Sequence, residues 1–374
     1  MKRIVALLFC GLLLCGLVAC GESPVVPDSD LPSTGASSDA GTSDSEKPGA
    51  VLFDPDVEHK FLACDVLNHS IVVYDMNAFD EVYDNLKNDR CIVWEWDADD
   101  DATCKGKPTA GLDAAKIRYS DYYECDVVIV CSSEGWAGIV DYETKTTLWE
   151  TEIPGSNLHS VEMMPNGDLV LVGSGEEGKV YYVPLSANVT EYTATIDAPS
   201  GHGACYDPVN DWLWILDYDE IFACKVENYG EKDVALTRVN GKSYNFTTRN
   251  KEASGHVLTP VAGQPGKYWM AAERLWIFDS NEMTLSRSYE YAGVYSAKES
   301  DWMKGVAHFE DGTMVQTVPK WGGKTLTDAT CGGFRVIVRE DDGSGKADVN
   351  VYKIVFQPRN REFYKVTAFS KNYQ

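Results

Sequence analysis

The sequence is poor in basic residues. It contains 33 Lys and Arg against 58 Asp and Glu in 374 residues, and its formal net charge at pH 7 is −25. A nucleic acid or another extended polyanion is bound through a basic face that neutralises its charges. We therefore expect no nucleic-acid partner, and a local cluster of basic side chains would stand out against the acidic background.

Several local signatures of catalysis are also missing. The chain contains no Gly-rich phosphate-binding loop, no nucleophile elbow and no His-Glu-x-x-His zinc motif. Amphipathic helical periodicity is scarce, whereas short apolar runs separated by turn residues are frequent. These patterns favour an all-β fold and point to no common enzyme class.

A long apolar run is present near the amino terminus, at Ile4–Val18 after Lys2 and Arg3. It is too short for a comfortable membrane span and ends in Leu17-Val18-Ala19-Cys20, which resembles the bacterial lipobox. The resemblance implies a signal peptide over residues 1–19 and lipidation of Cys20, by which the chain would contact the lipid bilayer. The alternatives are an ordinary signal peptide or an uncleaved anchor.

Residue 21 is Gly rather than Asp, so the inner-membrane retention signal is missing. We expect a lipid-anchored protein of the bacterial cell envelope, on the outer membrane, with its periplasmic or surface face undetermined. From Gly21 to Ala50 large apolar residues are almost absent, and such a segment cannot offset its ordering entropy by burial. Residues 20–50 are therefore predicted to be a flexible tether, and residues 51–374 a single β domain, which we expect to be a monomer.

A basic residue recurs at intervals of 43 to 61 residues, each time at the head of a repeating unit. The residues are Lys116, His159, His202, His256, Lys304 and Lys365. Most are followed by a short apolar stretch, a turn and further β-rich runs. A period of this length with several strands per repeat is typical of the blades of a β-propeller.

The strand count predicts six blades. Blade one has expected strands at Phe61–Asp65, Ser70–Tyr74 and Ile92–Trp96 but no first strand, and one strand, Phe363–Phe369, is left over at the carboxyl end. If this last strand completes the first blade, the ring closes and no long edge stays exposed. A β-sandwich or two smaller β domains is the alternative architecture.

Six segments together resemble a bacterial propeller family of unknown function: Phe61–Asp65, Ile92–Trp96, Leu158–Glu162, Gly201–Gly203, Gly255-His256 and Phe363–Lys365. This resemblance implies a six-bladed propeller and brings no activity with it. More distantly, Leu158–Asp168 resembles the His-containing blades of arylsulfotransferases, and Gly138–Glu150 is similar to quinoprotein-type repeats.

Because first strands of propeller blades line the central channel, the six repeated residues are expected to converge on one axis. The favoured hypothesis is a binding site for a small anion, such as a carboxylate, sulfate, phosphate or acidic sugar, without a cofactor. The first alternative is an enzyme. It would be a lyase with a divalent metal such as Zn or Mn held by His159, His202 and His256 or, as the arylsulfotransferase resemblance implies, a sulfotransferase-like enzyme in which a single His is the nucleophile. No Asp or Glu is expected at the repeated position, and the nearby lysines count against a metal. The second alternative is a structural or protein-interaction propeller with a water-filled channel.

The cysteines of the expected domain give little support to a disulfide framework. Cys125 and Cys131 flank one strand, and Cys205 and Cys224 fall on first and third strands of one blade, too far apart to be bridged. Most are therefore expected to be buried free thiols. Cys91 with Cys104, on either side of an acidic loop, is the one pair for which a disulfide is expected.

Overall fold

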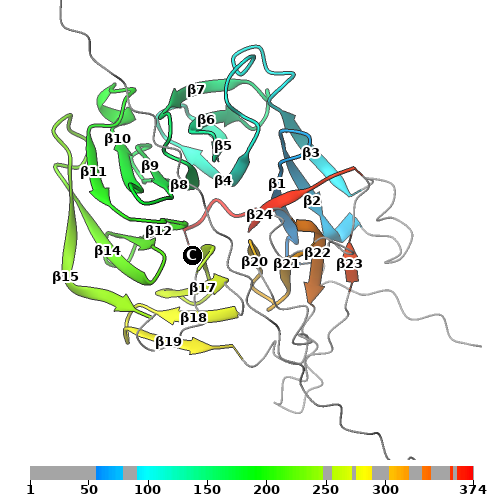
Figure 1. Cartoon of the computed structure of the whole chain (residues 1–374). Helices are drawn as coiled ribbons and strands as arrows, with labels where there is room; N and C mark the ends of the chain where they lie inside the picture. Colours follow the sequence, from blue (N-terminus) through cyan, green and yellow to red (C-terminus); the bar gives the residue numbers. More distant parts are fainter. Residues whose placement is uncertain are drawn as a thin grey trace, which may run out of the picture. The chain divides into compact units, whose positions relative to one another are not determined.

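The computed structural model is an all-β ring of antiparallel sheets with almost no helix (Figure 1). It describes residues 56–78, 91–246, 255–271, 275–288, 303–319, 331–337, 354–356 and 360–373. All of them belong to one compact unit, Ala50–Gln374. The predicted signal peptide, Cys20 and tether lie outside the described residues.

Four blades are separate four-stranded sheets, which we number two to five in chain order. Their strands are β4 (Leu112–Ser120), β5 (Cys125–Ser132), β6 (Trp136–Asp141) and β7 (Thr147–Glu152); β8 (Leu158–Met163), β9 (Leu169–Gly173), β10 (Lys179–Val183) and β11 (Ala194–Asp197); β12 (Gly203–Asp207), β13 (Trp212–Leu216), β14 (Glu220–Glu227) and β15 (Ala235–Asn245); and β16 (Val257–Pro260), β17 (Lys267–Ala271), β18 (Leu275–Asp279) and β19 (Thr284–Arg287).

The two remaining blades share one eight-stranded sheet. Blade six consists of β20 (Val306–His308), β21 (Met314–Pro319), β22 (Cys331–Ile337) and β23 (Ile354–Phe356), and blade one of β24 (Phe363–Ala368), β1 (Lys60–Asp65), β2 (Ser70–Asp75) and β3 (Ile92–Asp97). A single residue pair, Cys331 with Phe363, joins the two halves, so we treat them as two blades. The six-bladed propeller predicted from the repeat is confirmed.

The predicted closure of the ring is confirmed as well. The carboxyl-terminal strand β24 pairs antiparallel with β1, as the red and blue arrows side by side in Figure 1 show. The first strands β4, β8, β12, β16, β20 and β24 contact one another in turn around the axis. After β24 the chain continues to the middle of the ring, where Figure 1 marks the carboxyl terminus.

The hydrophobic core is divided among the gaps between blades. Among the described residues there are six apolar clusters, and each combines side chains of two neighbouring blades. In β1, for example, Leu62 and Cys64 pack toward blade two, whereas Phe61 and Ala63 pack toward blade six. Because successive side chains of a strand point to opposite faces, a strand between two such gaps must be apolar on both faces.

The strands expected at Phe61–Asp65, Ser70–Tyr74, Ile92–Trp96 and Phe363–Phe369 are observed with their ends shifted by at most one residue. Two single-turn 3-10 helices, Met76–Ala78 and Leu185–Ala187, complete the secondary structure of the described residues.

The cysteine predictions are confirmed except for the expected disulfide. Cys91 and Cys104 are both free and buried, so the expected bond between them is wrong. They belong to different gaps: Cys91 packs between blades six and one, and Cys104 between blades one and two. Strand β3 lies between the two gaps, which is why the acidic loop does not bring the thiols together. Burial raises the pKa of the Cys131 thiol to about 12, which makes it an apolar filler rather than a reactive thiolate.

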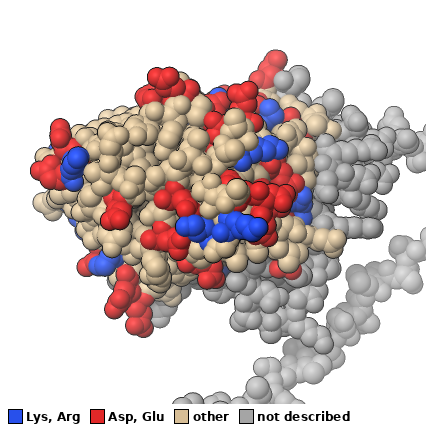
Figure 2. Space-filling view, turned by 90° about the horizontal axis from the view of Figure 1, so that it is seen from above, with Lys and Arg blue, Asp and Glu red and all other residues tan. Residues whose placement is uncertain are grey.

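Acidic side chains are numerous on one outer face of the propeller (Figure 2). Figure 2, a view turned by 90° from Figure 1, shows acidic side chains spread over one face with basic side chains among them. None of the helices in the described ranges is long and apolar enough to cross a membrane.

Candidate functional site

The three predicted histidines lie next to one another on the propeller axis. The ring centroids of His159 and His202 are 4.6 Å apart with the rings stacked, and those of His202 and His256 are 5.2 Å apart, edge to face. His159 and His256 are buried, and His202 is partly exposed. Three consecutive blades therefore contribute one imidazole each to a single group.

Two of the predicted lysines join this group around Tyr364. The Nζ of Lys304 lies 5.4 Å and that of Lys365 5.7 Å from the centre of the Tyr364 ring, within the range of a cation–π contact. The same ring lies 5.5 Å from His159. We call His159, His202, His256, Lys304, Lys365 and Tyr364 the His–Lys cluster.

Two glycines let the strands approach closely enough to bring these side chains together. A Cβ on Gly203 would lie 2.7 Å from Leu258 Cβ in the next blade, and a Cβ on Gly305 would lie 2.3 Å from Val366 N on β24. Only glycine fits such close approach of two backbones. Each glycine follows a cluster residue directly, His202 and Lys304, so the tight packing of first strands brings these side chains to the axis.

Bulges aim His159 and one further side chain, Asp113, at the axis. The pairing register of β4 shifts between Leu112 and Ala114, and that of β8 shifts between Leu158 and Ser160. The extra residues at these shifts are Asp113 and His159, at equivalent positions of blades two and three. His159 Nδ1 lies 2.6 Å from Asp113 Oδ2, and both side chains are nearly buried. A carboxylate therefore occupies the repeated position in blade two, contrary to the expectation that no Asp or Glu would.

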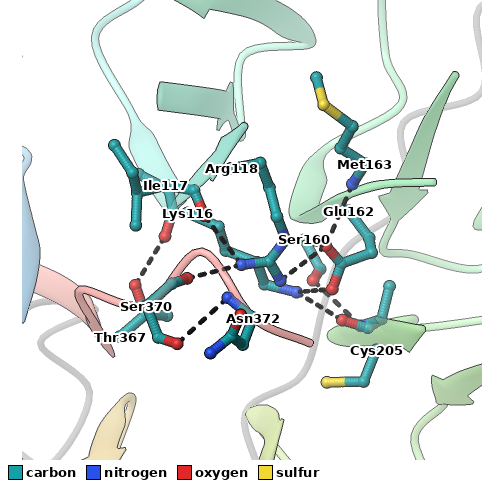
Figure 3. Close-up of polar contacts among 12 residues, drawn as sticks. Lys116, Ile117, Arg118, Ser160, Glu162, Met163, Cys205, Thr367, Ser370 and Asn372 are labelled. Atoms are coloured by element: carbon teal, nitrogen blue, oxygen red, sulfur yellow. Dashed lines mark hydrogen bonds and ion pairs between the residues drawn. The ribbon is translucent and has the colours of Figure 1, made fainter. Parts of the chain in front are cut away.

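Lys116 is not part of the His–Lys cluster. It lies four residues further along β4 than Leu112, and its Nζ contacts Glu162 Oε2 at 2.8 Å and donates to the Ala204 carbonyl at 2.6 Å. Arg118 contacts the same carboxylate, and Figure 3 shows how the side chains of Lys116 and Arg118 from blade two meet that of Glu162 from blade three. In the sequence repeat, Lys116 stands at the same position as His159, because a bulge cannot be recognised from residue type alone.

Lys365 acts across the axis instead of lining an open channel. Its Nζ donates to the backbone carbonyls of His159 and His202, so the ammonium links blade one with blades three and four. Burial lowers the pKa of Lys365 to about 8, although Asp113 acts in the opposite direction. The side chains of Lys365 and Lys116 thus fill part of the axis that was predicted to hold a ring of six equivalent groups.

His202 is the electrostatic centre of the cluster. Burial, together with the electrostatic effect of His159, Lys365 and His256, holds its pKa well below the usual value, so the free imidazole is neutral at pH 7. Its Nδ1–H donates to the Ser200 carbonyl at 2.6 Å. Ser200 has a φ of 61°, in the left-handed region. The Nδ1 proton leaves Nε2 as the ring's acceptor until it is protonated.

The imidazoles as arranged here do not form a metal-binding group. Within the described ranges, no three or more His, Cys, Asp or Glu side chains are placed to hold a metal ion. The rings of His159 and His202 are only 26° from parallel, so their in-plane lone pairs do not converge on one point. Facial binding by three histidines would require these rings to rotate.

Four residues of the axis were not identified from the sequence: Asp113, Arg118, Glu162 and Tyr364. Arg118 follows Lys116 by two residues on the same face of β4, which is the available signal for it. Glu162 and Asp113 carry no local signal, because their partners come from other blades. Tyr364 directly precedes Lys365, and because aromatic residues are common in strands, its residue type does not indicate a position at the axis.

Comparison with other proteins adds only resemblances in structure. The sequence matches no family model, and no curated protein matches it. A protein of unknown function from Bacteroides caccae has a TM-score of 0.49 at 9% identity, with 83% of this chain and 99% of that chain covered. A functionally unknown protein from Desulfotomaculum acetoxidans has a TM-score of 0.43 at 12% identity, with 75% and 76% covered.

Proposed function

We propose that this protein binds a small anion in the His–Lys cluster at the start of the first strands. The observation that carries the proposal is the position of His202, whose ring lies between two other imidazoles while Lys304 and Lys365 share the adjacent Tyr364 ring. A carboxylate, sulfate, phosphate or acidic sugar would relieve the repulsion between the two ammonium groups, favour protonation of His202 and accept hydrogen bonds from the cluster.

The alternative of a purely structural role explains the positions of two of the six predicted residues. Lys365 and Lys116 already donate to backbone carbonyls of other blades, as expected for side chains that hold a propeller together. The three histidines and Lys304 are therefore the groups expected to contact the anion directly, whereas the nearby charge of Lys365 attracts it without a direct contact. The lipid anchor on Cys20 and the metal-dependent enzyme stay predictions of the sequence.

Replacing Lys304 by Met is expected to weaken sulfate binding about 10- to 100-fold, the typical effect of losing a charge-assisted hydrogen bond. Isothermal titration of the purified protein with sulfate, phosphate and glucuronate measures the effect. The matched control is Lys225→Met, because Lys225 is an exposed lysine on β14 whose carboxylate partner is 3.8 Å away. Equal affinity in both variants contradicts the proposal.

Stoichiometric zinc or manganese in the purified protein would favour the metal-dependent enzyme instead of the anion site.

Anion binding is expected to weaken as the pH rises through about 8. A bound anion stabilises the charged forms of Lys365 and His202, so binding takes up protons and is strongest where these groups are charged. Lys365, with a pKa of about 8, loses its charge over this range, whereas sulfate does not change its own charge. We expect the Kd for sulfate to rise about tenfold between pH 7 and 9, measured by titration calorimetry. The variant Lys365→Met should flatten this rise, and a pH-independent Kd in the wild type contradicts the assignment.

A further inference from the structure

A cavity of about 290 Å³ lies beside the other ends of the first strands. Lys116 and Arg118 of β4, Thr259 of β16, His308 of β20 and Thr367 of β24 all line it. The chain that follows β24 adds Ser370 and Asn372 to its wall, seen in Figure 3 beside Arg118. The cavity is thus separate from the His–Lys cluster, whose residues lie at the starts of the same strands.

The buried part of the cavity is positively charged. Lys116 and Arg118 are almost fully buried, and Glu162 is the carboxylate that contacts both, so two cations face one anion. The Lys116 ammonium has three N–H donors, of which Glu162 and the Ala204 carbonyl accept two. The third N–H of this buried ammonium lies on the cavity wall. Because an anionic acceptor suits a buried cation best, this N–H favours a ligand with a carboxylate.

The exposed part of the cavity is negatively charged. Asp56, Glu58 and Glu310 line it and are all exposed to solvent. Glu58 is paired with Lys60, whose Nζ lies 2.6 Å away. A ligand that carried only negative charge would be repelled at this entrance, whereas an ammonium group would be attracted to it.

The intermediate walls offer neutral polar and apolar contacts. His308 Nδ1 accepts the backbone N–H of Ala262 at 3.1 Å, which places the proton of the neutral ring on Nε2 as a donor. Phe309, Phe369 and Pro260 contribute apolar surface. A volume of about 290 Å³ is at the lower limit for ligand pockets, so it suits a single small molecule and not a polymer.

We propose that this cavity binds a free α-amino acid, with its carboxylate toward Lys116 and its ammonium group toward the exposed carboxylates. Such a zwitterion matches both charges of the cavity at once. A simple anion matches only the buried part, and a neutral sugar matches neither. This site is independent of the anion site proposed above, and each can fail without the other.

The experiment is a thermal-shift screen of the whole purified protein against the twenty standard L-amino acids, followed by titration calorimetry of the strongest. For that amino acid, the analogue without the amino group and the analogue without the carboxylate are titrated in parallel. We expect both analogues to bind at least tenfold more weakly. Lys116→Met should weaken binding of the amino acid at least tenfold. Glu310→Gln should weaken it only a few-fold, because Glu310 is exposed.

Two controls separate this site from the rest of the molecule. Glu282→Gln removes an exposed carboxylate on the turn after β18, away from the cavity residues, and should not change amino-acid affinity. Lys304→Met, which tests the anion site, should not change it either. If Lys116→Met does not fold, Glu310→Gln and the two analogues still test the proposal. It is wrong if no amino acid binds, if the analogue without an amino group binds equally well, or if glucose binds and amino acids do not.

Discussion

Glu162→Gln is expected to lower the free energy of unfolding by about 3–5 kcal/mol, the cost of leaving buried charge without its partner. The Glu162 side chain is 1% exposed, and its carboxylate contacts Lys116 at 2.8 Å and Arg118 at 2.8 Å. Burial opposes its ionisation, yet Arg118 and Lys116 hold its pKa below the usual value, so it is charged in the folded protein. A neutral amide would leave two buried cations uncompensated between blades two, three and four.

Chemical denaturation of wild type and variant measures this loss. The matched control is Glu227→Gln, because Glu227 forms an exposed pair with Lys225 at 3.8 Å and should contribute less than about 0.5 kcal/mol. The Glu162 contribution is present above the unfolded-state pKa and is lost as the pH falls through the folded-state pKa, because the folded value is the lower one. The free energies of unfolding of wild type and Glu162→Gln, plotted against pH, should therefore converge in acid. A difference below about 1 kcal/mol at pH 7 would show that the network contributes little to stability.

Ending the chain after Glu362 is expected to abolish cooperative folding. This truncation removes β24, whose Phe363 and Val366 pack in the gap between blades six and one and whose Lys365 links blade one to blades three and four. The first strand of blade one would be missing, and both β1 and β22 would lose their pairing with β24. An open ring with exposed strand edges is prone to aggregate.

Size-exclusion chromatography and the near-ultraviolet circular dichroism of the truncated protein measure this effect. Adding a synthetic peptide of residues 360–374 should restore a compact monomer, because an extended peptide can pair with an exposed strand edge. A peptide of the same composition in scrambled order is the control. A truncated protein that melts cooperatively without the peptide would show that the ring does not depend on this closure.

The architecture could be predicted from the sequence because its signals are local. A strand between two inter-blade gaps must be apolar on both faces, and this pattern repeats every 43 to 61 residues with turn residues between the strands. The missing first strand of blade one and the surplus strand Phe363–Phe369 can be found by counting alone. The histidines and Lys304 at the starts of first strands follow from the same repeat.

What the tertiary structure decided is which of these side chains meet. Asp113, and not Lys116, occupies the position equivalent to His159, because bulges in β4 and β8 shift the pairing register. Lys116 instead contacts Glu162, 46 residues away in the chain, and Cys91 and Cys104 are separated by the strand between them. A bulge and a contact between blades depend on how strands pair and pack in three dimensions. Residue types along one strand specify the strand, but they do not specify what lies across the axis from it.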